Sequence, residues 1–144
     1  MWTFTLPTKI QFGAGVSRNC AQVARDYGKR PVVVTGKTLV KTDRVRGIIA
    51  ELGEVPVFAE VTPNPTVQQV DALTRVIREE HCDTVIAIGG GSPLDCAKAA
   101  SALAPTNETS IRAFLGGGRQ FGPARLPLIA VPTTSGTGSE VTPV

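Results

Sequence analysis

Short apolar runs, separated by amphipathic stretches, organise the middle of the chain. Four of these runs are rich in β-branched residues and predict strands: Pro31–Thr35, Val55–Val61, Thr84–Ile88 and Leu126–Val131. Most of them are continuous rather than alternating, which is typical of strands that are buried on both faces of a sheet. Val55–Val61 is the weakest of the four, because Pro56 and Glu60 interrupt it.

The stretches between these runs repeat apolar residues at helical spacing. They predict four helices: one between Gly15 and Gly28, then Thr38–Leu52, Val67–Glu80 and Pro93–Leu103. The alternation of strands and helices predicts an α/β fold with a doubly wound parallel sheet. A glycine-rich stretch, Asn107–Ala124, predicts a surface excursion with one short helix before the last strand.

The first residues of the chain have a different pattern. Trp2–Leu6 and Lys9–Phe12 are both β-prone and flank Pro7-Thr8, which predicts an N-terminal β-hairpin ahead of the sheet. Trp2–Leu6 carries no charge, and an unpaired strand edge of this kind readily pairs with another chain. We therefore expect a homodimer that forms through this strand.

Composition narrows the class of protein. The 144 residues suit one domain, and 42% apolar with 19% charged residues indicates a folded chain. A net charge of +3 without a basic run argues against nucleic-acid binding. Three cysteines without CxxC spacing support neither a disulfide framework nor a zinc site, and reduced thiols suit the cytoplasm. We expect no signal peptide and no membrane contact, because no apolar run approaches the roughly 20 residues of a membrane helix.

Candidate chemistry gathers after the four strands. The segments that follow them are Gly36–Thr38, Thr62–Pro65, Gly89–Ser92 and Thr133–Gly138. Ligands of open α/β sheets bind beyond the carboxyl ends of the strands, so we expect these segments to converge. In the third segment, three glycines precede a helix with Ser92 as its N-cap and Pro93 as its first residue. Such a turn favours an anion such as a pyrophosphate, and the alternative is a tight turn without a ligand.

Three other motifs fail on spacing or placement. Gly36-Lys37-Thr38 ends like a phosphate-binding Walker loop, but Pro31 occupies the position of its first glycine. Gly13-x-Gly15 lacks the third glycine of a dinucleotide fingerprint, because Arg18 is there. His81-Cys82-Asp83 is better explained as a solvated helix end than as a metal site, and the single His supports no catalytic triad.

Two long motifs resemble those of the iron-containing (group III) alcohol dehydrogenases. They are GGGSPLDCAKA at Gly89–Ala99 and PTTSGTGSEVT at Pro132–Thr142, and FGAG at Phe12–Gly15 and PNPT at Pro63–Thr66 fit the same order. The resemblance implies that residues 1–144 form a Rossmann-like, NAD(P)-binding domain. It also implies a second, helical domain in which one Asp and three His bind Fe²⁺ or Zn²⁺. This chain has one His, so we expect a fragment that is inactive alone, from an enzyme that moves hydride between NAD(P) and an alcohol/aldehyde pair.

The same resemblance assigns cofactor-binding positions, whereas catalytic residues remain unassigned. The positions are Asn64, Pro65, Gly90, Gly91, Ser92, Asp95, Thr133, Thr134 and Thr137. The two glycines and Ser92 would hold the pyrophosphate, and Asp95 would lie near the nicotinamide-side ribose or carboxamide. The three threonines would line the adenosine and phosphate side, while Asn64 and Pro65 would border the cleft.

One position departs from the family pattern. The residue after the first parallel strand is often an Asp that binds the adenosine ribose, and here it is Gly36. We therefore predict that the parent enzyme accepts NADP, with Lys37 and Thr38 as a cation and a hydroxyl for the extra phosphate. The alternative is that Gly36 only shapes the turn and NAD is preferred.

Two other readings of the whole chain remain open. The first is a nucleotide-binding module that catalyses nothing. The second is a sister enzyme on the same architecture, such as glycerol dehydrogenase or dehydroquinate synthase, although Thr133–Thr142 favours the alcohol dehydrogenases.

Overall fold

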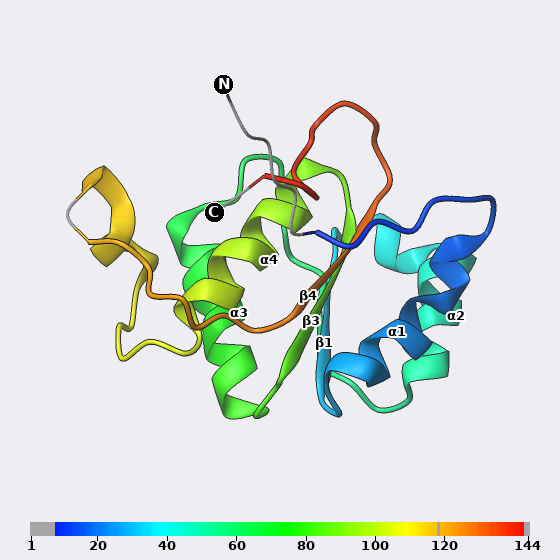
Figure 1. Cartoon of the computed structure of the whole chain (residues 1–144), viewed down its shortest axis with the longest axis horizontal. Coiled ribbons are helices and arrows are strands. Elements are labelled where there is room, and N and C mark those ends of the chain that lie inside the picture. The colour runs from blue at the N-terminus through cyan, green and yellow to red at the C-terminus, as the bar shows by residue number, and fades with distance from the viewer. Residues whose placement is uncertain (1–7, 118, 143–144) are drawn as a thin grey trace, which may run out of the picture.

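A four-stranded parallel sheet forms the centre of the molecule in a computed structural model of the chain (Figure 1). The structure describes residues 8–117 and 119–142. The strands are β1 (Pro31–Val34), β2 (Val57–Phe58), β3 (Thr84–Gly89) and β4 (Leu128–Pro132), in the order β2-β1-β3-β4. All three strand pairs are parallel, so the predicted α/β fold with a parallel sheet is confirmed.

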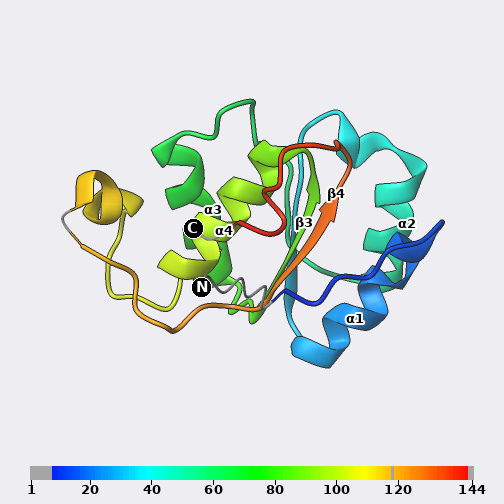
Figure 2. The ribbon, with the colours of Figure 1, turned by 45° about the horizontal axis from the view of Figure 1, so that its top comes forward.

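Helices cover both faces of this sheet (Figures 1 and 2). The α-helices are α1 (Cys20–Tyr27), α2 (Asp43–Leu52), α3 (Val67–Glu79) and α4 (Gly91–Leu103). Three 3₁₀ segments accompany them: η1 (Val16–Asn19), η2 (Leu39–Lys41) and η3 (Ile111–Gly117). The first two α-helices lie on one face, and α3 and α4 lie on the other. None of the helices in residues 8–117 and 119–142 is long and apolar enough to cross a membrane.

Alternate residues of the central strands supply two hydrophobic cores. Val33 and Ile86 pack with residues of α1 and α2, whereas Val32, Val34 and Val85 pack with residues of α3 and α4. All five are fully buried, because successive side chains of a strand point to opposite faces. Burial of each side chain contributes about 1.5–3 kcal/mol, which explains why these runs carry no polar alternation.

The predicted N-terminal hairpin is not confirmed. Lys9–Phe12 is not a strand, and its apolar side chains Ile10 and Phe12 are 59% and 101% exposed. Its other predicted half, Trp2–Leu6, lies outside the described residues. β-propensity alone therefore misled at Lys9–Phe12, because a strand needs a partner for its backbone groups.

Two other predicted elements are shorter than expected. Only Val57–Phe58 of Val55–Val61 joins the sheet, and it does so as an edge strand. Its preceding residue Pro56 offers a carbonyl to the Val33 N–H at 3.0 Å but has no N–H of its own to donate. The helix predicted over Thr38–Leu52 is divided into η2 and α2, because Thr42 is extended and caps the second piece.

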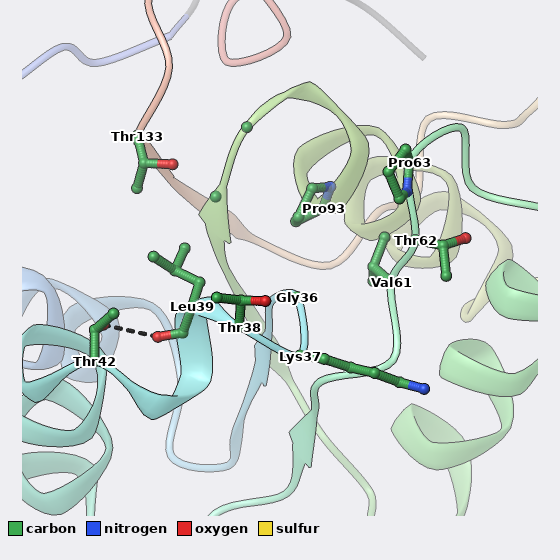
Figure 3. Close-up of a pocket in the computed structure, with 12 residues that line it drawn as sticks. Gly36, Lys37, Thr38, Leu39, Thr42, Val61, Thr62, Pro63, Pro93 and Thr133 are labelled. Carbon is green, nitrogen blue, oxygen red and sulfur yellow. Dashed lines mark hydrogen bonds between the residues drawn. The ribbon is translucent and has the colours of Figure 1, made fainter.

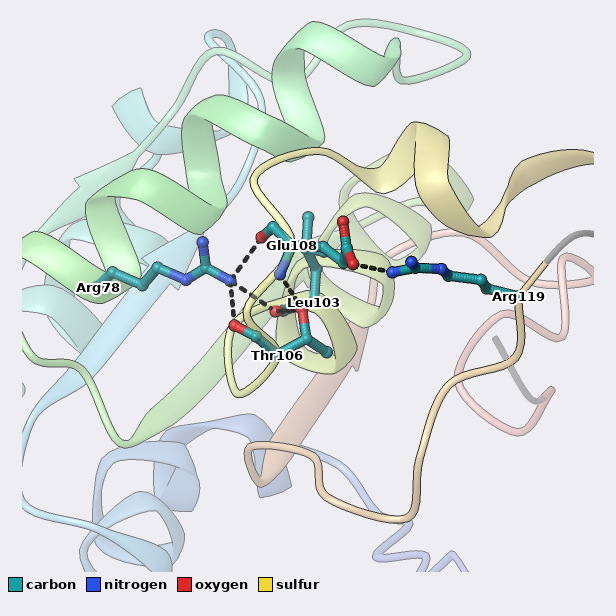
Figure 4. A network of polar contacts seen from close by, with 5 residues as sticks. All are labelled: Arg78, Leu103, Thr106, Glu108 and Arg119. Atoms are coloured by element: carbon teal, nitrogen blue, oxygen red, sulfur yellow. Dashed lines mark hydrogen bonds and ion pairs between the residues drawn. The ribbon is translucent and has the colours of Figure 1, made fainter.

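Polar contacts tie the predicted surface excursion to the helices (Figure 4). The Arg78 guanidinium of α3 donates to the carbonyls of Leu103, Ala104, Thr106 and Glu108 at 2.8–3.1 Å. Arg78 therefore satisfies carbonyls that the C-terminal end of α4 leaves without helical partners. An ion pair between Glu108 and Arg119 spans the excursion itself. These contacts lie on the helical flank of the fold, away from the strand ends.

A carboxylate fixes the opposite, amino-terminal edge of the sheet. Asp83 accepts hydrogen bonds from the backbone N–H groups of Lys29 and Arg30, both at 2.9 Å. Burial alone would raise the pKa of Asp83, but these bonds and one from the Thr84 hydroxyl stabilise the charged form and lower the pKa. A Cβ on Gly28 would collide with Asp83 and Thr84, so this turn requires glycine. Asp83 thus holds the turn before β1 in place, a role that the interpretation of His81-Cys82-Asp83 as a solvated helix end did not include.

Candidate functional site

A cleft of about 480 Å³ lies between the carboxyl ends of β1 and β3 (Figure 3). β1 continues into α2 on one face of the sheet, whereas β3 continues into α4 on the other. The chain therefore diverges between these neighbouring strands, which is the switch point where open α/β sheets bind ligands. The cleft is lined by Gly36, Lys37, Thr38, Leu39, Thr42, Val61, Thr62, Pro63, Gly89, Gly90, Pro93 and Thr133.

The glycine turn between β3 and α4 forms one wall of the cleft. Helix α4 begins at Gly91 with Gly90 as its N-cap, two residues earlier than the predicted start at Pro93. Ser92 is therefore inside the first turn and is not the N-cap, and the missing N–H of Pro93 costs nothing there. Helix geometry leaves the N–H groups of Gly91 and Ser92 without intrahelical acceptors. This positive end of α4 is suited to bind an anion.

The segment after β4 folds across this glycine turn. A Cβ on Gly90 would lie 3.2 Å from Thr134 Oγ1, and one on Gly91 would lie 3.2 Å from Ser139 Oγ. The Thr133 N–H donates to the Gly89 carbonyl at 2.8 Å and thereby continues the pairing of β4 with β3. The absence of side chains at Gly90 and Gly91 thus lets the segment after β4 pack against the turn. The sequence alone did not distinguish this packing requirement from a requirement for ligand binding.

Lys98 of α4 fixes the far end of the same segment. Its Nζ donates to the carbonyl of Thr142 at 3.2 Å and to Thr142 Oγ1 at 2.8 Å. Lys98 Nζ also lies 3.4 Å from Asp95 Oδ1. Asp95 is exposed and does not line the cleft, so its predicted place beside the nicotinamide remains a prediction.

The turn after β1 is more open than the glycine turn. A Cβ on Gly36 would meet only the Val61 carbonyl, at 3.6 Å, which is an ordinary contact. Lys37 and Thr38 line the cleft and are exposed. Figure 3 shows that the Lys37 side chain extends away from Thr133 and Pro93. This turn can therefore accept a side chain at Gly36 without crowding.

The loop between β2 and α3 forms the remaining wall. Thr62 and Pro63 line the cleft, whereas the predicted Asn64 and Pro65 do not. Asn64 has a left-handed backbone, with φ 57°, and its N–H donates to Ser92 Oγ at 3.2 Å. This bond connects the loop directly to the first turn of α4.

Sequence reasoning missed the residue that anchors this loop. Gln69 and Thr66 form a capping box at the start of α3, and the spacing Thr66-x-x-Gln69 is a recognisable signal for it. The Gln69 side chain also bonds to the Glu60 carbonyl at 2.8 Å and to Thr62 Oγ1 at 3.2 Å. These additional contacts depend on tertiary structure and have no sequence signal.

The structure gathers most of the predicted site residues. Gly36, Lys37, Thr38, Gly90 and Thr133 line the cleft, and Gly91, Ser92 and Thr134 lie beside it through the contacts above. Thr137 lies there too, since a Cβ on Gly91 would be 3.5 Å from its Cβ. A second hollow of about 450 Å³ adjoins the cleft and shares three lining residues with it. The shared residues are Leu39, Thr42 and Thr133. The roles predicted for the site residues did not anticipate two separate hollows.

The described residues do not fit a catalytic iron or zinc. In residues 8–117 and 119–142, no three His, Cys, Asp or Glu side chains gather as a metal site would require. Burial raises the pKa of the Cys20 thiol to about 11 and that of Cys96 to about 12. Both thiols therefore remain protonated at neutral pH and are poor metal ligands.

A parallel sheet with an open helix N-terminus at its switch point is an arrangement at which α/β domains bind anionic ligands. The family model of the iron-containing alcohol dehydrogenases matches residues 7–144, and the chain belongs to this family. The sequence is 37% identical to alcohol dehydrogenase 4 of Schizosaccharomyces pombe, over 96% of this chain and 34% of that protein. This match confirms the family that the motifs indicated.

Two solved structures share the fold over nearly the whole chain. Sulfoacetaldehyde reductase of Bifidobacterium kashiwanohense, in complex with NAD⁺, gives a TM-score of 0.91 at 38% identity and covers 99% of this chain and 38% of that one. NADH-dependent butanol dehydrogenase A of Thermotoga maritima gives 0.84 at 31% identity, with 96% and 36% covered. The chain therefore spans little more than a third of the length of these relatives.

Proposed function

We propose that this chain binds the dinucleotide cofactor of an NAD(P)-dependent alcohol or aldehyde oxidoreductase. The observation that carries the proposal is the cleft at the switch point, into which the glycine turn and the open end of α4 converge. Homology supports the same ligand, because one similar structure holds NAD⁺ and another similar enzyme is NADH-dependent.

Each wall of the cleft has a part in holding the cofactor. The N–H groups of Gly91 and Ser92 bind the pyrophosphate, and the Ser92 hydroxyl, which accepts from Asn64, has its own proton to donate. Thr133, with its neighbours Thr134 and Thr137, lines the adenosine and phosphate side. Asn64 and Pro65, which follow the lining residues Thr62 and Pro63, would lie at the border of the bound cofactor, and Asp95 would lie near its nicotinamide-side ribose or carboxamide. The bound nicotinamide accepts or supplies the hydride.

We further propose that the cofactor is NADP. A carboxylate at Gly36 would bind the ribose hydroxyls of NAD and repel the 2′-phosphate of NADP. Gly36 removes that repulsion and leaves open space, since only the Val61 carbonyl lies within contact distance of its Cβ position. Lys37 and Thr38 then supply a cation and a hydroxyl for the phosphate. The similar enzymes that use NAD⁺ or NADH are the reason to test this choice directly.

The whole enzyme oxidises an alcohol or reduces an aldehyde, and this chain alone does neither. The relatives are named for alcohols and aldehydes, but the chain covers only 34–38% of their lengths. Its single His cannot supply the three His ligands that the family resemblance implies for Fe²⁺ or Zn²⁺. We expect purified chain with added Fe²⁺ or Zn²⁺ to show no alcohol oxidation. Measurable metal-dependent turnover would contradict this statement.

Assembly and location follow from the same reasoning. We propose a homodimer that pairs through Trp2–Leu6, the segment that the sequence predicts to be a strand. Sedimentation of the chain at high concentration tests this, and a strictly monomeric species would oppose it. We also propose the cytoplasm, because all three cysteines are unpaired and buried. Small alcohols or aldehydes are the expected substrates, and neither nucleic acid nor membrane is an expected partner.

Calorimetric titration of the 144-residue chain tests the proposal. NADP⁺ and NAD⁺ should both bind in a one-to-one complex, with NADP⁺ binding more tightly. Adenosine is the control ligand, and it should bind more weakly than either because it lacks the pyrophosphate. If neither NADP⁺ nor NAD⁺ gives binding heat, and neither displaces the other, the proposed function is wrong.

A further inference from the structure

The side chain of Gln69 holds the β2–α3 loop through hydrogen bonds to three of its residues. Its Oε1 accepts from the Thr66 N–H and the Thr62 hydroxyl, both at 3.2 Å, and its Nε2 donates to the Glu60 carbonyl at 2.8 Å. Gln69 itself belongs to helix α3 and is half-buried. A single side chain on a rigid helix thus fixes three positions along the loop, and every polar atom of its amide has a partner.

The fixed loop continues directly into the cleft. Thr62, which bonds to Gln69, is a lining residue, and Pro63 follows it. The next residue, Asn64, adopts φ 57° and donates its N–H to Ser92 Oγ at 3.2 Å. Asn adopts left-handed backbone more readily than most residues other than glycine, and contacts on either side help to keep Asn64 in it. The bonds of Gln69 on one side and of Ser92 on the other supply those contacts.

We infer that Gln69 is a positioning residue of the cofactor cleft, which sets the β2–α3 loop and, through Asn64, the hydroxyl of Ser92. This inference rests on the proposed dinucleotide binding. Gln69 does not touch the cleft itself, and it acts by keeping the loop in the arrangement that a ligand meets. A loop that holds this arrangement for only a tenth of the time raises the apparent Kd about tenfold.

Four variants separate this role from the stability of helix α3. Gln69→Ala removes all side-chain contacts to the loop. Thr66→Ala removes the hydroxyl of the same capping box but leaves the bonds of Gln69 to Glu60 and Thr62. Gln68→Ala changes the same residue type one position earlier, where the side chain is exposed. A fourth variant, Gln69→Glu, keeps both acceptor bonds but replaces the donor to Glu60 with a carboxylate oxygen that the Glu60 carbonyl repels.

Calorimetry with NADP⁺ on these variants gives the first readout. Gln69→Ala should raise the Kd about tenfold and Gln69→Glu by less, whereas Thr66→Ala and Gln68→Ala should leave it unchanged. Thermal unfolding should show a similar loss for Gln69→Ala and Thr66→Ala, since both lose the cap. Equal weakening of binding by Thr66→Ala and Gln69→Ala, or no weakening by Gln69→Ala, would overturn the inference.

Hydrogen exchange gives a second readout that needs no ligand. The Asn64 amide, which is bonded to Ser92, should exchange about tenfold faster in Gln69→Ala than in the unmodified chain and in Thr66→Ala. Unchanged exchange in Gln69→Ala would also overturn the inference. If the unmodified chain binds neither dinucleotide but this exchange pattern is found, the proposed function fails while the positioning of the loop by Gln69 stands.

Discussion

The two glycine turns that face each other across the cleft differ in what requires their glycines. At the turn after β3, Gly89 has φ 153° and a Cβ there would lie 2.7 Å from Pro93 Cγ. A Cβ on its neighbour Gly90 or Gly91 would lie 3.2 Å from a side-chain oxygen of the segment after β4. At the turn after β1, a Cβ on Gly36 would meet nothing closer than 3.6 Å. Packing therefore requires glycine at the turn after β3, whereas the turn after β1 has room for a side chain that could serve ligand binding.

The largest effect should come from a side chain at the crowded turn. Gly89→Ala combines a backbone conformation that side chains rarely adopt with a close contact to Pro93, so we expect a loss of about 2–4 kcal/mol in the free energy of unfolding. Gly36→Ala is the matched control, and it should be neutral or stabilise by about 0.4–1 kcal/mol. Urea unfolding measures both, and equal losses for the two variants would remove the distinction between the turns.

The next effect concerns cofactor choice at the open turn. Gly36→Asp should fold normally and lower the preference for NADP⁺ over NAD⁺ about tenfold, because a carboxylate near the 2′-phosphate costs about 1.4 kcal/mol even after screening. Gly36→Asn has the same shape without the charge and should retain the preference. The ratio of the two Kd values by calorimetry is the measurement. A ratio that already favours NAD⁺ strongly, and that Gly36→Asp leaves unchanged, would show that this position does not select the cofactor.

A smaller effect should follow from the contact between Gly91 and Ser139. Gly91→Ala should lower the free energy of unfolding by about 1 kcal/mol, since the crowding outweighs the better helix propensity of Ala. Removing the facing oxygen with Ser139→Ala should restore most of this loss in the double variant. A double-mutant cycle in urea measures the coupling. Additive losses would mean that the loop does not press on Gly91 in solution.

The smallest expected effect is on stability at acid pH and comes from Asp83, at the edge of the sheet opposite the cleft. Because Asp83 is far from both glycine turns, it serves as a control for them. The folded state lowers the pKa of Asp83, so the stability that its ionised form contributes is present above the unfolded pKa. That contribution should be lost as the pH falls below about 4, towards the folded pKa. Asp83→Asn should remove this part of the acid dependence in thermal unfolding and leave dinucleotide binding at pH 7 unchanged. Weaker binding in this variant would mean that the two edges are coupled.

The sequence anticipated the sheet better than the details of the site. Continuous apolar runs such as Thr84–Ile88 predicted buried strands, because burial on both faces leaves no place for polar residues. The hairpin was wrong at Lys9–Phe12, since strand formation depends on partners that local propensity does not reveal. The crowding of Gly91 by Ser139 was also inaccessible, because the two residues meet only after β4 is in place.

The site itself was predicted in part. Gly36, Gly90 and Thr133 converge as expected from the carboxyl ends of parallel strands. The helix start was misplaced at Pro93 because Ser92 and Pro93 suit an N-cap and a first residue, yet Gly90 takes the extended N-cap conformation. Gln69 escaped notice because its bonds to Glu60 and Thr62 depend on how the loop folds back.

Amide chemical shifts during titration of the ¹⁵N-labelled chain with NADP⁺ test the central claim most directly. Binding at the switch point should shift the resonances of Gly36, Gly90, Gly91, Ser92 and Thr133. The amides of Lys29 and Arg30, which bond to Asp83 at the far edge, should stay in place. Shifts confined to the far edge, or no shifts at millimolar NADP⁺, would contradict dinucleotide binding in this cleft.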